Sequence, residues 1–225
     1  SGTLSTIQWN LPFLIYGIAL LMAFFAYFTA YEPTTVASRS AQAAASNAST
    51  TPYPTALMAR LAATTFVLAT VYFVYTLQFS LALDAMGVKD GGQIGKYSGI
   101  AALGVPVGAI LFNFIAKRSA VFQFSLVFML LGLGMLGIGL TLGIKATIAL
   151  AWIQQLGSGM TIPVLINWGL RILPAEYRGR GMGWWASGFF LGQFMSPLFV
   201  SLVNGFSGGL LNTFMVAGAL CVAIA

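Results

Sequence analysis

The chain has 225 residues, of which 59% are hydrophobic and 6% are charged, and its mean hydropathy is +0.90. Soluble domains carry about 25% charged residues, so this composition excludes an ordinary soluble core. The net charge of +6 is found in many nucleic-acid-binding proteins, but the charged residues here fall between long uncharged runs. We therefore expect contact with a lipid bilayer and none with nucleic acid.

Uncharged runs divide the whole chain, and they cover residues 11–31, 61–83, 97–116, 119–144, 146–170 and 181–225. A helix needs about 20 apolar residues to cross a bilayer, and backbone groups in lipid must be hydrogen-bonded within their own segment. A transmembrane β-barrel would instead show alternating segments of about 10 residues. The runs therefore predict an all-α, polytopic transmembrane helix bundle.

The expected helices, in chain order, cover about 10–31, 57–86, 94–116, 119–142, 146–171, 181–203 and 208–225. Between the first two lies a stretch rich in Ala, Ser and Thr, a composition that does not form a packed core. The chain begins with Ser, and its last apolar run has no polar flank. We therefore expect a piece of a longer protein. Residues 1–31 would belong to a preceding bundle, 32–56 would form a cytoplasmic linker, and 57–225 would form a six-helix bundle with a truncated last helix.

Cationic residues concentrate in alternate loops of this arrangement. One set of loops carries three lysines, and the other carries seven cations: Arg39, Arg60, Lys117, Arg118, Arg171, Arg178 and Arg180. Cytoplasmic loops are enriched in Lys and Arg. The pattern therefore places the seven cations in the cytoplasm, and it predicts a multi-pass protein of a bacterial inner (plasma) membrane.

Two of the cationic loops carry sequence motifs. The loop 174–183 reads PAEYRGRGMG and resembles the P-x-x-x-R-G loop of major facilitator superfamily transporters. The segment 109–118 reads AILFNFIAKR and is similar to their G-x-x-x-D-x-x-G-R-K/R signature. It departs from that signature because Ala109 and Ala116 replace the glycines and Asn113 replaces the acid. With the linker and the six helices that follow, the chain resembles the C-terminal half of such a transporter.

This resemblance implies secondary active transport of a small organic solute by alternating access, with the N-terminal half of the same protein as partner. It implies no cofactor other than a proton or ion gradient. The run from Gly188 to Pro197, described in the next paragraph, favours efflux of a drug-like or sugar-like compound. It also implies gating roles for the cytoplasmic loop residues Asn113, Lys117, Arg118, Glu176, Arg178 and Arg180. No helix carries an Asp, Glu, His, Lys or Arg near its middle, so we expect the coupling residue in the preceding half.

Small residues and prolines recur at helical spacing. Small residues four apart allow close helix crossing, and proline permits a bend. The pattern predicts packing or bending positions at Gly104, Pro106, Gly108, Gly188, Gly192, Ser196 and Pro197. The Gly188-to-Pro197 run is similar to the G-x-x-x-G-P run of the family's antiporters, with Ser196 in place of a glycine.

Polar side chains inside two of the expected helices are the candidates for solute binding. A buried amide must find partners, so it is retained where a function or a structural bond requires it. The candidates are Tyr72, Tyr75, Gln78, Trp152, Gln154, Gln155 and Ser158. In the resembled family the helices at these two places line a central cavity. The alternative for each residue is a hydrogen bond between helices of the bundle. Neutral amides and aromatic rings suit an uncharged or amphipathic solute.

Other functions have less support in the sequence. The chain has no histidine and one cysteine, and no pair of carboxylates is placed for catalysis. We therefore expect neither an enzyme nor a metal site, although an intramembrane enzyme stays the least favoured alternative. A non-transporting receptor or a channel is the stronger alternative. A pore would require a ring of like charges or a re-entrant loop.

Overall fold

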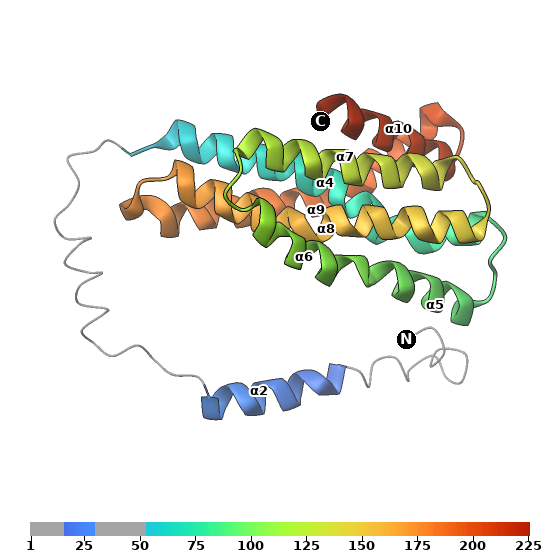
Figure 1. Cartoon of the computed structure of the whole chain (residues 1–225), viewed down its shortest axis with the longest axis horizontal. Coiled ribbons are helices and arrows are strands. Elements are labelled where there is room, and N and C mark those ends of the chain that lie inside the picture. The colour runs from blue at the N-terminus through green and yellow to red at the C-terminus, as the bar shows by residue number, and fades with distance from the viewer. Residues whose placement is uncertain (1–15, 30–52) are drawn as a thin grey trace.

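A computed structural model of the chain describes residues 16–29 and 53–225, and this part is helical, with no strand (Figure 1). Five segments are long and apolar enough to span a bilayer. The predicted all-α transmembrane bundle is thus confirmed. The helices are α2 (Gly17–Thr29), α4 (Thr55–Ala85), α5 (Gly91–Ala102), α6 (Gly104–Ile115), α7 (Ala120–Gly139), α8 (Ile144–Ile172), η2 (Ala175–Tyr177), α9 (Arg178–Ser207) and α10 (Leu210–Ile224).

The helix expected at 94–116 is broken into α5 and α6 at Leu103. Proline has no backbone N–H, so Pro106 cannot donate to the carbonyl of Ala102 four residues earlier. The amide of Leu103 instead donates to the carbonyl of Ile100 at 3.3 Å, which is the tighter spacing of a 3₁₀ turn. The two helices together still make one span of 25 residues, Gly91–Ile115.

The helix expected at 181–203 is longer at both ends. It begins at Arg178, directly after η2, and continues through Asn204 to Ser207. It stops at Gly208, which has a φ of 75° and a left-handed conformation. Glycine adopts this conformation without a side-chain clash and commonly ends helices. The predicted break near residue 204 therefore lies a few residues later.

The first expected helix and the linker are described only in part. Helix α2 covers the middle of the predicted 10–31 segment, and none of its residues is buried. In Figure 1 it lies apart from the other helices. Most of the predicted linker, 32–52, lies outside the described residues. Its last two positions, Thr55 and Ala56, already belong to α4.

The remaining helices form a bundle with two main packing units. Helix α4 packs chiefly along α9, while α8 packs along α6 and α7, and α10 packs on α7. Glycines permit these close crossings. A Cβ atom on Gly192 of α9 would lie 2.7 Å from the carbonyl oxygen of Phe66 in α4. A Cβ atom on Gly104 of α6 would lie 2.6 Å from the carbonyl oxygen of Trp152 in α8. Backbones this close allow extensive van der Waals contact, which drives helix association in lipid.

Candidate functional site

Of the seven cations predicted to be cytoplasmic, the six that the structure describes gather at one end of the bundle, and Arg39 lies outside the described residues. The guanidinium of Arg60 lies over the Trp168 ring, 6.0 Å from its centroid, near the end of α8. The guanidinium of Arg171 reaches the α6–α7 turn that carries Lys117 and Arg118. The start of α8, next to Lys145, lies at the opposite end of the bundle, where the loops carry fewer cations. The arrangement is consistent with a single cationic face.

A buried amide closes the α6–α7 turn at this end. Gln123 of α7 is 1% exposed, and its Nε2 atom donates to the carbonyl oxygens of Ile115 at 3.1 Å, Ala116 at 3.1 Å and Arg118 at 3.0 Å. The last carbonyls of a helix have no partner within it. Gln123 therefore serves as a cap for α6 supplied from the next helix.

Two residues of α8 bind the same turn. Asn167 donates from Nδ2 to the Ala116 carbonyl at 3.2 Å and to Oε1 of Gln123 at 3.3 Å. Arg171 donates to the Ala116 carbonyl and, at 3.2 Å, to the Arg118 carbonyl. These three side chains, which we call the α6 cap, tie α6, α7 and α8 together at the cationic end. The two α8 members of the α6 cap lie more than 40 residues along the chain from the carbonyls that they bind. The sequence therefore gave no sign of the α6 cap.

The predicted gating residues lie on the surface of this end. Asn113 and Lys117 are exposed, and so are Glu176 in η2 and Arg178 at the start of α9. Arg180 is exposed as well, and its guanidinium lies 5.9 Å from the centroid of the Tyr53 ring. Of the predicted gating set, Arg118 is the one whose backbone carbonyl enters the α6 cap. Whether these residues act as a gate stays a prediction.

Gln154 lies in the interior of the bundle. It is fully buried, and neither Nε2 nor Oε1 has a protein hydrogen-bond partner. Its Cα and Cβ atoms pack against Gly134 of α7, where any added Cβ would collide with them. Leaving a buried polar group unpaired costs about 1–3 kcal/mol. Gln154 is therefore the predicted site residue whose amide is most deeply buried without a protein partner.

Ser158 and Tyr75 are also buried with unpaired oxygens. Ser158 is 3% exposed and one turn from Gln154 on α8, and Tyr75 of α4 is 4% exposed. The Tyr75 ring stacks on Phe79 with centroids 4.5 Å apart. By contrast, the nearby Thr161 hydroxyl donates to the Gly157 carbonyl at 2.9 Å. The sequence pattern alone did not separate the satisfied hydroxyl from the unsatisfied one.

The other candidates are only half-buried. Tyr72 lies next to Phe73 and Phe189, with ring centroids 4.9 Å and 6.0 Å away. Gln78, Trp152 and Gln155 are partly exposed, and the last two lie on the side of α8 that packs against Gly104 of α6. The structure therefore does not place the seven candidates on one surface: three lie in the interior, and four lie nearer the bundle surface.

Comparison with solved structures gives one informative likeness. It is to a crystal structure of a POT family transporter in complex with 5-aminolevulinic acid, with a TM-score of 0.57 and 16% sequence identity. The match covers 94% of this chain and 50% of that chain. This chain shares the fold of that transporter. It spans half of the transporter's length. Comparison with protein-family models gives no match, and neither does comparison with curated proteins.

Four more buried polar groups without a protein partner were not among the predicted binding residues, and one of them is the Ser98 hydroxyl of α5. Thr65 of α4 and Ser196 of α9 are both fully buried, and neither hydroxyl has a protein partner. The indole Nε1 of Trp185 in α9 is likewise buried and unpaired, and its ring stacks on Phe189 with centroids 5.5 Å apart. Ser196 was predicted only as a packing position. A Ser, Thr or Trp within an apolar run carries no sequence signal of being unpaired.

Proposed function

We propose that the chain is the C-terminal half of a secondary active transporter of the major facilitator type, which moves a small uncharged organic solute by alternating access. The loop motifs at 109–118 and 174–183 and the fold shared with a POT family transporter both support this proposal. The preceding half of the protein supplies the second bundle. Export of a drug-like or sugar-like compound is the direction favoured by the Gly188-to-Pro197 run.

The observation that carries the proposal is Gln154. A fully buried amide with two unpaired polar atoms is unfavourable in a purely structural core. In a transporter the same amide binds solute when the bundle opens to it. Ser158, one turn away, and Tyr75 on α4 add hydroxyl groups that both donate and accept hydrogen bonds.

The charge of the site supports an uncharged cargo. Helix α4 carries no charged residue between Arg60 and Asp84, and α8 carries none between Lys145 and Arg171. A charged group bound there would have no opposite charge within these helices, and an unpaired charge in a low-dielectric interior is strongly disfavoured. The groups that respond to the ion gradient therefore lie in the preceding half.

The cationic end controls the change between the inward-open and outward-open states of the transporter. Its exposed cations meet the cytoplasmic face of the partner half, and the α6 cap keeps α6, α7 and α8 together while that contact forms and breaks. A receptor or a channel remains the alternative function. It would bind solute at Gln154 without moving it, or move it without a second bundle closing.

The test is transport by the full-length protein, both halves included, in sealed vesicles with a proton gradient. The probe panel consists of radiolabelled uncharged solutes, such as sugars and amides, with zwitterionic 5-aminolevulinic acid as the charged comparison. We expect gradient-dependent movement of at least one uncharged solute, which Gln154→Ala and Tyr75→Ala reduce at least tenfold. Unchanged transport in both variants would exclude the site, and no gradient-dependent movement of any probe would contradict the function.

A further inference from the structure

A hollow of about 520 Å³ opens on the surface of the cationic end, between the segment that leads into α4 and the first turns of α9. We call it the Arg180 hollow, and its lining residues are Tyr53, Arg180, Gly183, Trp184 and Ser187. All five are exposed, so the hollow faces the surroundings of the bundle and not its core. It is therefore a surface site, separate from the buried candidates for solute binding.

The positive charge of this hollow belongs to Arg180. Its guanidinium lies 5.9 Å from the centroid of the Tyr53 ring, and that ring packs edge-on against Tyr177 with centroids 5.4 Å apart. Within residues 16–29 and 53–225, Arg180 forms no ion pair. A guanidinium carries five N–H donors in a planar fork that fits the oxygens of a phosphate. The Arg180 hollow thus presents a phosphate-binding group to whatever surrounds the bundle.

Aromatic residues place the Arg180 hollow at the boundary between water and lipid. Tyr53, Tyr177 and Trp184 lie around the guanidinium, and Trp and Tyr are enriched at membrane–water interfaces. The charge distribution predicts that this end is cytoplasmic, and the cytoplasmic leaflet carries the anionic lipids. Basic pockets between helices at this level bind phosphate-bearing head groups. The surroundings of the hollow are therefore rich in a ligand of opposite charge.

An exposed stripe of α9 continues from the hollow into the membrane. Ser187, Leu191, Phe194 and Leu198 are spaced by four, three and four residues, so they share one face of the helix. Leu191 is 54% exposed, Phe194 71% and Leu198 48%. We call these four residues the α9 stripe. It rises about 16 Å, close to half of a hydrocarbon core. A cation above an apolar stripe as long as one leaflet fits a phospholipid, whereas a free phosphate would use the cation alone.

Gly183 and Ser187 add room and an acceptor to the Arg180 hollow. A Cβ atom on Gly183 would meet no atom within 4 Å, so open space lies next to this glycine. The Ser187 hydroxyl donates to the Gly183 carbonyl at 3.0 Å, so its oxygen can serve a ligand only as an acceptor. An acceptor beside a guanidinium fits a phosphate whose substituent carries a donor, such as the hydroxyl groups of a glycerol head group.

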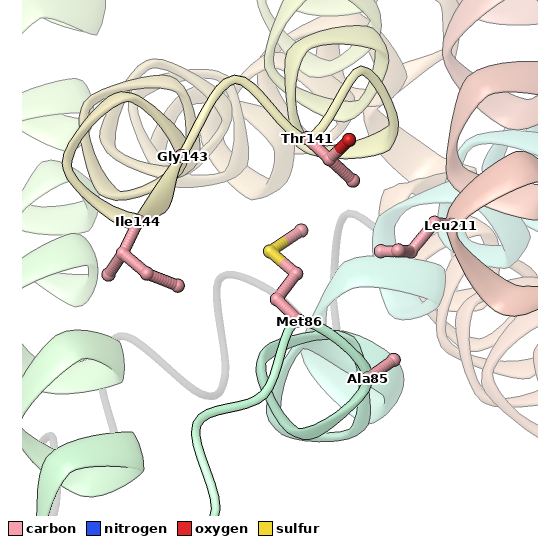
Figure 2. A pocket seen from close by; sticks show the side chains of 6 residues that line it. All are labelled: Ala85, Met86, Thr141, Gly143, Ile144 and Leu211. Atoms are coloured by element: carbon pink, nitrogen blue, oxygen red, sulfur yellow. The ribbon is translucent and has the colours of Figure 1, made fainter.

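The hollow at the opposite end of the bundle lacks this chemistry. It has a volume of about 260 Å³, and none of its lining residues is charged: Ala85, Met86, Thr141, Gly143, Ile144 and Leu211. Figure 2 shows the Met86 side chain pointing across it toward the turn that carries Thr141. Without a cation, this hollow offers an anionic head group nothing that a neutral one lacks. The preference for an anion therefore belongs to the Arg180 hollow.

We propose that the Arg180 hollow binds an anionic phospholipid of the leaflet that meets the cationic end. Its phosphate contacts Arg180, a donor of its head group contacts Ser187, and one acyl chain lies along the α9 stripe. The inference goes beyond the proposed function, because it assigns a ligand that is not transported. In the proposed cycle the exposed cations of this end meet the partner half in one state, and the lipid binds in the state in which that contact is broken.

Lipid retention by the full-length protein, both halves included, tests this site. The protein is delipidated in detergent, and native mass spectrometry counts the lipid retained after addition of phosphatidylglycerol or of zwitterionic phosphatidylcholine. Arg180→Gln removes the cation, and Gly183→Leu fills the hollow without changing the charge. Lys117→Gln is the matched control, because Lys117 is an exposed cation of the same end that does not line the hollow.

We expect the wild type to retain phosphatidylglycerol at least fivefold better than phosphatidylcholine. Arg180→Gln and Gly183→Leu should each lower that retention at least fivefold, and Lys117→Gln should change it less than twofold. Wild-type retention in Arg180→Gln would overturn the site, and so would an equal loss in Lys117→Gln. Retention of no phosphatidylglycerol would mean that the partner half covers the hollow, and displacement by excess inorganic phosphate would mean that no lipid is required. Either result would overturn the proposal.

The outcome is separable from the proposed function. A protein that moves solute but shows no preference for phosphatidylglycerol contradicts the lipid site alone. A protein that retains phosphatidylglycerol at Arg180 but moves no solute contradicts the function alone.

Discussion

The side-chain amide of Gln123 donates to the backbone carbonyl of Arg118 at 3.0 Å, across the turn between α6 and α7. Gln123 and Gln154 are both almost fully buried in this bundle, yet only the first has protein partners. The same residue type therefore has two roles. One glutamine caps a helix end, and the other is the one that we propose binds the solute.

Replacing the two glutamines by Leu should affect stability in opposite ways. Gln123→Leu removes the three hydrogen bonds that Gln123 donates and the one that it accepts from Asn167, and it leaves carbonyls of the turn with fewer partners, so we expect a loss of about 1–3 kcal/mol in the free energy of unfolding. Gln154→Leu removes unpaired polar atoms at similar volume, so we expect no loss or a small gain. Unfolding in mixed detergent micelles measures both. A larger loss for Gln154→Leu would mean that its amide is bonded in the native protein.

Arg171 should act through its hydrogen-bond geometry and not only through its charge. Its two guanidinium nitrogens reach two carbonyls at once, a geometry that a lysine ammonium does not reproduce. We expect Arg171→Lys to lower the thermal midpoint about as much as Arg171→Gln. The control is Arg178→Lys, at an exposed position of the same end, which should leave the midpoint unchanged. Full retention of stability in Arg171→Lys would mean that Arg171 contributes only its positive charge, which sets the membrane topology.

Two glycines of α9 should respond differently to Ala. A Cβ on Gly192 would lie 2.7 Å from both the Phe66 carbonyl oxygen and the Ala69 Cβ atom, so Gly192→Ala forces α4 and α9 apart. We expect a loss of about 1–3 kcal/mol, as for overpacking elsewhere. A Cβ on Gly183 meets nothing within 4 Å, so Gly183→Ala should gain about 0.5–1 kcal/mol from helix propensity. Equal effects at the two sites would contradict the close α4–α9 crossing.

The break between α5 and α6 should depend on Pro106. Pro106→Ala restores the N–H that can donate to the Ala102 carbonyl, so we expect one continuous helix. Spin labels at the exposed positions 93 and 113 would then report a distance near 30 Å, the value for about 20 residues of straight helix. Pro197→Ala is the control, because α9 is already continuous there. If the distance is the same with and without the proline, packing of Gly104 and Gly108 on α8 causes the break.

The sequence predicted the helices well because the bilayer imposes one strong constraint on their length and composition. It did not predict which proline breaks a helix. Pro163 and Pro197 lie inside continuous helices, whereas a break precedes Pro106. The difference depends on whether neighbouring helices hold the backbone straight, which a single sequence does not show.

The candidate site was predictable only in part. Gln154, Ser158 and Tyr75 stood out as polar residues in apolar runs, and they prove to be buried and unpaired. Trp185 was hidden because an aromatic residue is ordinary in a membrane helix. The α6 cap was hidden because Arg171 reads as a topology signal until the fold brings it to the turn at Ala116.

The most direct measurement of the central claim is solute transport by the full-length Gln154→Leu protein in sealed vesicles, with its unfolding free energy determined on the same preparation. The account predicts that gradient-driven transport falls at least tenfold while stability is kept. Transport at the wild-type rate in this variant would contradict it.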